Sequence, residues 1–232
     1  MYRLVILICS GLVCVITPAD LAAEEALRLA SFQADATPPL GSPLCNGHVK
    51  PVMEITTPLT ARGIVLLGAG KPIVLCAFDW VGIGNGSYDQ FRAELAKGVG
   101  TTADRVALPP LHQHDAPGSD FITERMLAKE GLSKQFSNAD FDAQVMKRVA
   151  TAARQSLTKA EPITHFSHGA GRVEKVASNR RILGPDGKVA LRRMSKSTKP
   201  EAKAAPEGTI DPLVRMIVFW QNETPLSVLT YY

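Results

Sequence analysis

Residues 61–80 read ARGIVLLGAGKPIVLCAFDW, and this stretch holds two strongly apolar runs. The runs cover residues 63–67 and 72–78, and a glycine-rich turn separates them. Short apolar runs joined by such a turn are typical of a β-hairpin. The stretch therefore predicts two paired strands. Its turn contains GAGK, which lacks the longer spacing and the following Ser or Thr of a phosphate-binding loop.

Further strands are predicted on both sides of this hairpin. Residues 29–34 read as a short strand before it, and residues 104–108 read as another strand after it. The last third of the chain is rich in strand patterns. It includes a GPDG turn at residues 184–187 and a second hairpin about residues 221–224.

Two helices are predicted between the strands. Residues 88–99 place apolar side chains on one face, with Ser87 as the N-cap. Residues 139–157 form the longest predicted helix, with Asn138 as the N-cap. Helices and strands alternate early and strands dominate late. The predicted fold class is therefore α/β or α+β, a single layered domain with a mixed β-sheet flanked by helices.

The N-terminal residues have the pattern of a secretory signal peptide. A short basic head precedes an apolar stretch at residues 4–16, and small residues follow at Ala22 and Ala23. The apolar stretch is short for a membrane span, although an uncleaved anchor is the alternative interpretation. We therefore expect a signal peptide at residues 1–23, one domain at residues 24–232, and a secreted or periplasmic protein with no membrane span after cleavage.

Cleavage of this leader would leave two cysteines, Cys45 and Cys76. In an oxidising compartment they can form one disulfide. The alternative is that Cys76, inside the apolar run IVLCAF, is a small buried hydrophobic residue. The sequence leaves both interpretations open.

Basic residues are concentrated in KVALRRMSKSTKPEAKA, residues 188–204, which contains a single Glu. A solvated loop accounts for this composition. The segment has no interleaved aromatic residues, so the sequence predicts no nucleic-acid partner.

A histidine pair stands in LPPLHQHDAPGSD, residues 108–120. In an extended chain the side chains at i and i+2 share a face, so His112 and His114 would present two imidazoles to one point. Imidazole is the commonest protein ligand for zinc, and a carboxylate such as Asp115 either binds the metal or orients a histidine. The alternative is a pair of exposed polar residues at the mouth of a loop.

A catalytic zinc normally takes three protein ligands, so the pair needs a third. The candidates are Asp115, Asp79 at the end of its apolar strand, and the pair His165 and His168. Asp79 can equally cap the loop that follows it, and the latter two histidines can lie on a sheet surface.

Several motifs, in this order, resemble the N-terminal domain of the neutral/alkaline non-lysosomal ceramidase family, particularly its shorter bacterial members. They are QADATPPLG, PLTARGIVL, IVLCAFDW, DRVAL leading to HQHDAP, VEKVASNRR, and IDPLVRMIVFWQNETPLSVLTYY. The resemblance runs from about residue 30 to residue 232. It implies a zinc-dependent hydrolase of C–N amide bonds that acts on a small-molecule or lipid N-acyl substrate.

The resemblance also assigns roles to residues. The family's motif, usually H-T-H-S-G-P, supplies a zinc ligand that corresponds to His112, with His114 beside it in the active site. Asp115 and Ala116 stand where the family has Ser and Gly. The family's Asn-Arg pair, which helps to hold the substrate, corresponds to Asn179 and Arg180. By themselves, Arg180 and Arg181 can bind a carboxylate or a developing oxyanion, or they are ordinary surface charges.

In the family, the segment resembling LSVLTYY continues directly into the second zinc histidine. We therefore expect a truncated member that is incomplete at the C-terminus, binds zinc weakly or not at all, and has little activity as an isolated chain. The alternative is a non-catalytic secreted remnant or binding module that keeps only the fold. Self-association through the edge of the unpaired final strand is also expected.

Overall fold

The computed structural model describes residues 26–68, 70–194 and 196–232. The predicted signal peptide at residues 1–23 lies outside these ranges. Across the ranges, no helix is long and apolar enough to cross a lipid bilayer.

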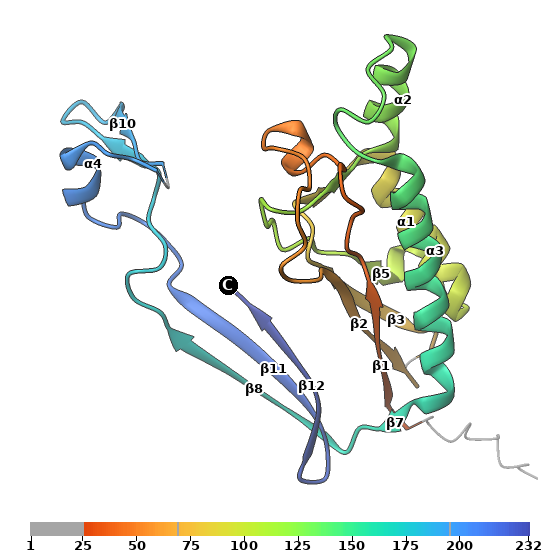
Figure 1. Cartoon of the computed structure of the whole chain (residues 1–232). Helices are drawn as coiled ribbons and strands as arrows, with labels where there is room; N and C mark the ends of the chain where they lie inside the picture. The colour runs from red at the N-terminus through yellow and green to blue at the C-terminus, as the bar shows by residue number, and fades with distance from the viewer. Residues whose placement is uncertain (1–25, 69, 195) are drawn as a thin grey trace, which may run out of the picture.

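A five-stranded mixed sheet forms the centre of the body, which comprises residues 26–163 (Figure 1). Its strands, in spatial order, are β5 (Val106–Ala107), β3 (Ile73–Phe78), β2 (Thr60–Leu67), β1 (Arg28–Asp35) and β7 (Glu161–Pro162). All neighbours are antiparallel except β3 and β5, which are parallel. The hairpin predicted from residues 61–80 is confirmed as β2 and β3, and the mixed sheet is confirmed with it.

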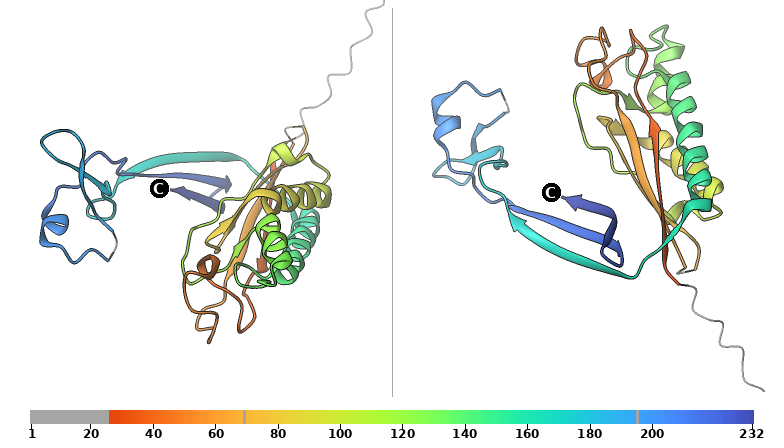
Figure 2. Two further views of the ribbon diagram at one scale, coloured as in Figure 1. Left: turned by 90° about the horizontal axis from the view of Figure 1, so that it is seen from above. Right: turned by 60° about the horizontal axis from the view of Figure 1, so that its bottom comes forward.

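Helices α1 (Asn85–Val99) and α3 (Ala139–Ser156) pack side by side against one face of this sheet (Figures 1 and 2). The shorter helix α2 (Phe121–Lys129) contacts α1. The other short elements of the body are β4 (Gly82–Ile83), β6 (Gly118–Ser119), and the 3-10 turns Cys45–Gly47, Ala103–Arg105 and Leu157–Lys159. The predicted layered α/β architecture is confirmed.

The sequence predicted the N-cap of α3 correctly and the N-cap of α1 incorrectly. Asn138 caps α3 as expected, because its side chain accepts a hydrogen bond from Phe141 N at 3.3 Å. The prediction that Ser87 caps the next helix is wrong. Helix α1 begins at Asn85, its N-cap is Gly84, and Ser87 lies inside its first turn. Ser87 is instead fully buried, and its hydroxyl accepts the backbone N–H of Phe121 at 2.8 Å. This bond ties α1 to the start of α2, a helix that the sequence patterns did not predict.

A three-stranded antiparallel sheet, here called the arm, projects from the base of the body (Figures 1 and 2). Its order is β12 (Thr224–Tyr231), β11 (Leu213–Gln221) and β8 (His165–Arg172). The hairpin predicted about residues 221–224 is confirmed by the pairing of Gln221 with Thr224. Within the described chain, β12 pairs only with β11, so it is an edge strand. Self-association through this edge stays a prediction.

The distal lobe comprises residues 173–212, which connect β8 to β11 at the far end of the arm (Figure 1). It contains the hairpin of β9 (Arg181–Leu183) and β10 (Val189–Arg192), followed by α4 (Pro200–Ala204). The predicted GPDG turn joins the two strands, with Gly187 at φ 74°. Of the lobe's described residues only Ala202 is fully buried. The lobe therefore lacks a substantial core.

Trp80 lies at the centre of the core of the body. Its ring is fully buried among Phe78, Phe91 and Phe141, with ring centroids 5.5, 6.0 and 6.1 Å away. The indole N–H donates to the carbonyl of Ala36 at 2.9 Å, so the polar edge of the ring is satisfied inside the core. The backbone that follows β3 is consequently fixed in position.

Gly63 provides the space that the ring of Phe32 occupies between two strands. The two residues are cross-strand partners, and a Cβ at position 63 would lie 2.3 Å from the Phe32 ring and 2.8 Å from the Leu75 carbonyl oxygen. Both separations are well below a van der Waals contact. Even a methyl group would force the ring or the backbone of β3 to move.

We therefore expect Gly63→Ala to lower the free energy of unfolding by about 1–3 kcal/mol through overpacking. Urea denaturation followed by circular dichroism measures the change. Gly169→Ala is the matched control, because a Cβ at this strand position meets no atom within 4 Å. Equal midpoints for the two variants would contradict the proposed clash.

Candidate functional site

The histidine loop, residues 109–117, runs alongside the end of β3. Phe78 N donates to Pro109 O at 3.1 Å, and Leu111 N donates back to Phe78 O at 2.9 Å. His112 N then donates to Trp80 O at 3.0 Å. The histidine loop is therefore held by backbone hydrogen bonds to residues 78–80.

The two histidine side chains lie together, although the loop is not extended there. His112 has φ 60°, in the left-handed region, where strand alternation does not apply. The rings of His112 and His114 nevertheless lie 5.1 Å apart, edge to face. Our expectation that the rings converge agrees with this geometry. The chain is not extended at His112, however, so the two rings do not meet by strand alternation as the sequence predicted.

Backbone contacts determine which nitrogen of His112 is available. Its Nδ1 lies 2.8 Å from the carbonyl oxygen of Val81. A carbonyl only accepts, so Nδ1 carries the proton in this contact, and in the neutral ring Nε2 then has a free lone pair. This is the arrangement in which a metal-binding histidine is oriented by a backbone oxygen. Val81 could not be recognised from the sequence, because it contributes its main-chain carbonyl and not its side chain.

The Asp79 carboxylate forms hydrogen bonds on both sides, with β2 and with the histidine loop. One of its carboxylate oxygens accepts from both Thr60 N and Thr60 Oγ1, each at 2.8 Å. The other lies 3.5 Å from Nε2 of Gln113, the residue between the two histidines. Asp79 therefore connects the start of β2 to the histidine loop.

The second half of the loop is closely packed. Ala116 is fully buried, and its carbonyl accepts from Cys45 N at 2.9 Å. A Cβ on Gly118 would lie 1.9 Å from Oδ1 of Asn46, so the 3-10 turn Cys45–Gly47 packs directly on the backbone of Gly118. Asp115 is exposed at the surface of the loop. Ala116 thus fills a packed position.

Cys45 and Cys76 are both free thiols in the structure. Cys76 lies on β3 within the core of the body, and burial raises the pKa of its thiol far above the ordinary value. Its position matches the interpretation as a small buried hydrophobic residue. Cys45 belongs to the turn that packs against the histidine loop.

Asn179 and Arg180 lie in the distal lobe, just before β9. The Asn179 side chain accepts Arg181 N at 2.8 Å, and its backbone N–H donates to Glu207 O at 2.7 Å. These bonds close the base of the lobe. The lobe stands apart from the body in each view of Figures 1 and 2, so the structure does not bring this pair to the histidine loop.

The remaining ligand candidates, His165 and His168, lie on β8 of the arm, and both are exposed. The ring of His165 stacks on Trp220 with centroids 5.8 Å apart and planes within 3°. Within residues 26–68, 70–194 and 196–232, no group of three His, Cys, Asp or Glu side chains is placed to hold a metal ion. In the described part of the chain, His112 and His114 are therefore not joined by a third side chain of these types.

Comparison with solved structures identifies the architecture. The chain superposes on a neutral ceramidase from Pseudomonas aeruginosa with a TM-score of 0.63 and 17% sequence identity. It superposes on a ceramidase complexed with C2 with a TM-score of 0.60, again at 17% identity. The chain folds like part of a neutral ceramidase.

This ceramidase-like fold confirms the resemblance that the motifs suggested, at the level of the fold. The alignments cover 90% of this chain and 31–32% of the two ceramidases, so the chain spans about a third of their length. No protein-family model and no curated protein matches the sequence.

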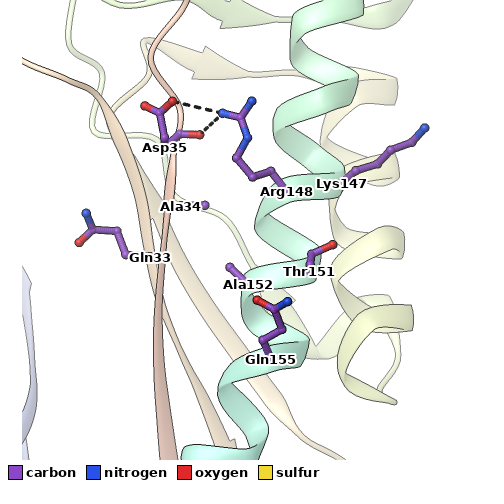
Figure 3. Close-up of a pocket in the computed structure, with 8 residues that line it drawn as sticks. All are labelled: Gln33, Ala34, Asp35, Lys147, Arg148, Thr151, Ala152 and Gln155. Atoms are coloured by element: carbon purple, nitrogen blue, oxygen red, sulfur yellow. Dashed lines mark hydrogen bonds and ion pairs between the residues drawn. The ribbon is translucent and has the colours of Figure 1, made fainter.

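A groove of about 470 Å³ lies on the body between β1 and α3 (Figure 3). Lys147, Arg148 and Gln155 line one wall, and Gln33 and Asp35 line the other. Arg148 binds both the backbone oxygen of Asp35, at 2.6 Å, and its carboxylate, at 3.3 Å. The groove is open and distant in sequence from the histidine loop, and its central charges neutralise each other. No histidine or cysteine is among the residues that line it.

Asp142 is a buried carboxyl group in the first turn of α3. The side chain is fully buried, and neither oxygen forms a hydrogen bond with another described residue. Burial, together with the neighbouring Glu124 carboxylate, raises the pKa of Asp142 to about 8. The nearby Ser119 hydroxyl opposes this rise, but its hydrogen bond goes to Ser87 Oγ at 3.0 Å. Asp142 is therefore protonated at neutral pH.

The raised pKa of Asp142 predicts that the protein becomes less stable as the pH rises. The folded-state value of about 8 exceeds the ordinary value of 3.8, so the folded protein holds one more proton between these pH values. The stabilisation is complete below about pH 4 and is lost as the pH rises to about 8. We expect the free energy of unfolding of the wild type, relative to Asp142→Asn, to fall by about 1.4 kcal/mol per pH unit between pH 5 and 7.

Urea denaturation at a series of pH values measures this difference. Asp140→Asn is the control, because Asp140 stands two residues away with its side chain 80% exposed, and this variant should keep the wild-type slope. Parallel curves for the wild type and Asp142→Asn would show that Asp142 is ionised in the folded protein.

Proposed function

We propose that this chain supplies the first part of the active site of a zinc-dependent N-acyl amide hydrolase. The observation that carries the proposal is the convergence of His112 and His114, with Nε2 of His112 left free by the Val81 carbonyl. The ceramidase-like fold supports it, since one of the similar structures is named a neutral ceramidase. The substrate class, a lipid or small-molecule amide, comes from the same likeness.

In this proposal the chain's own residues hold and orient. His112 and His114 would bind zinc, while Asp79 would hold Gln113 and thereby the loop between them. When bound, zinc polarises an amide carbonyl and lowers the pKa of a bound water. Asn179 and Arg180 would bind the polar part of the substrate if the distal lobe reaches the site in the active form.

Two imidazoles are fewer than the three protein ligands of a catalytic zinc. We therefore propose that the ligand set is completed by groups other than residues 26–232 of one copy of this chain. We also propose that the protein acts outside the cytoplasm, on the basis of the signal-peptide pattern at residues 1–23.

A non-catalytic binding module is the second candidate function. It is favoured by one observation, that the described residues assemble no third ligand beside the histidine pair. The two functions differ in whether the pair binds zinc at all.

Zinc binding tests the proposal directly. Competition with a chromophoric chelator at pH 7.5 should reveal one weak site in the wild-type chain. Because loss of even an outer-shell partner weakens metal sites by roughly 10–100-fold, we expect His112→Ala to weaken binding by about tenfold or more. His168→Ala, which removes an exposed arm histidine, should bind like the wild type. Equal affinity in all three proteins, or no binding, would favour the non-catalytic module.

The same proposal predicts the activity of the isolated chain. A fluorogenic N-acyl sphingoid base, incubated with the purified chain and excess zinc, should be hydrolysed no faster than in buffer, because two ligands hold the metal weakly. The measurement is product release over time, with and without chelator. Hydrolysis that requires zinc and is lost in His112→Ala would show that this chain completes the site by itself.

A further inference from the structure

The distal lobe carries a concentrated positive charge. Between Lys175 and Lys203 it holds nine Lys or Arg residues and two acidic residues, whereas the whole chain has a formal net charge of +4. All of these basic side chains except that of Arg193 are exposed. Among the described residues, none of the nine forms an ion pair. The charge is therefore available to a partner.

The acidic residues at the root of the lobe do not offset this charge, because they interact elsewhere. Glu174 pairs with Arg172 of β8 at 3.9 Å, and Asp211 pairs with Arg215 of β11 at 2.8 Å. The carboxylate of Glu207 accepts the backbone N–H of Lys175 at 3.2 Å. These bonds lie where the lobe joins the arm, so its outer part stays basic.

One face of the β9–β10 hairpin combines cations with apolar side chains. Arg181 and Arg192 are cross-strand partners, as are Leu183 and Val189. Because Arg181 and Leu183 are two residues apart on one strand, the two pairs share a face. Leu183 is 62% and Val189 45% exposed. Like charges directly opposite each other destabilise a hairpin, so this face is suited to an anionic surface that lies across both arginines.

We propose that this hairpin face docks the protein on an anionic lipid bilayer. Clusters of four to eight Lys or Arg residues attract anionic lipids, and apolar side chains beside them enter the interface between head groups and acyl chains. Leu183 and Val189 would provide the apolar contact, flanked by Arg181 and Arg192. The lobe projects at the end of the arm, away from the body, so the bilayer can approach it unhindered (Figure 1).

Nucleic acid is the competing anionic partner, and the composition of the lobe disfavours it. Single-stranded nucleic acid is bound through aromatic side chains on which bases stack, together with a basic groove. Residues 173–212 contain no Phe, Trp or Tyr, whereas they expose Val176, Leu183, Val189 and Met194. Aliphatic side chains among cations match a lipid interface.

Vesicle co-sedimentation tests the proposal with the full chain. We expect binding to vesicles of 70% phosphatidylcholine and 30% phosphatidylglycerol, and no binding to pure phosphatidylcholine. Each basic residue near the surface contributes about fivefold to binding, so Arg181→Gln with Arg192→Gln should weaken binding by at least tenfold. Leu183→Ser with Val189→Ser should reduce the binding that remains at high salt.

The matched control is Lys97→Gln with Lys129→Gln, which removes the same charge from exposed positions on the body. It should bind within twofold of the wild type. Circular dichroism of every variant checks that the fold is kept. Lys196→Gln with Lys199→Gln provides a second pair in the lobe, outside the hairpin, in case the arginine variant unfolds.

Four results would overturn the proposal. They are no binding at low salt, equal binding to both kinds of vesicle, an equal loss in the control pair, and tighter binding to a single-stranded oligonucleotide than to the anionic vesicles. The measurement needs neither zinc nor substrate. Its outcome is therefore independent of the proposed hydrolase function.

Discussion

The burial of Trp80 is the constraint on which the candidate site depends. Its ring is held by three phenylalanine rings and its N–H by the Ala36 carbonyl, so its backbone has little freedom. That backbone then accepts His112 N, and the next carbonyl accepts His112 Nδ1. The core thereby sets both the position and the tautomer of the first histidine. A change in aromatic packing would reach the imidazole through two hydrogen bonds.

The features that the sequence predicted well are those set by neighbouring residues. The β2–β3 hairpin, the Asn138 cap and the turn before β10 all follow from local apolar runs, a capping side chain or a glycine. The histidine pair was also recognisable, because its members are adjacent along the chain. The fold of the chain could be inferred because several sequence motifs occur in the order of a known family.

The features that the sequence did not predict depend on distant partners. Ser87 has the right chemistry for a cap, but it is buried by α2 and accepts Phe121 N instead. The left-handed conformation of His112 arises because the loop must follow the carbonyls of β3, and no local pattern encodes this. The separation of Asn179 and Arg180 from the histidine loop was not predictable either, because the arm that holds the distal lobe away from the body determines it. Main-chain groups such as the Val81 carbonyl carry no sequence signal at all.

The contact between Gly118 of β6 and Asn46 of the 3-10 turn Cys45–Gly47 links two positions that are 72 residues apart in sequence. Space for only one side chain exists between them, and Asn46 occupies it with a backbone φ of 56° that glycine also adopts readily. The small residue can therefore reside on either side of the contact, but a bulky residue cannot stand on both. In a lineage that keeps this fold, the two positions should change together, and an alignment of its members would record the exchange as covariation.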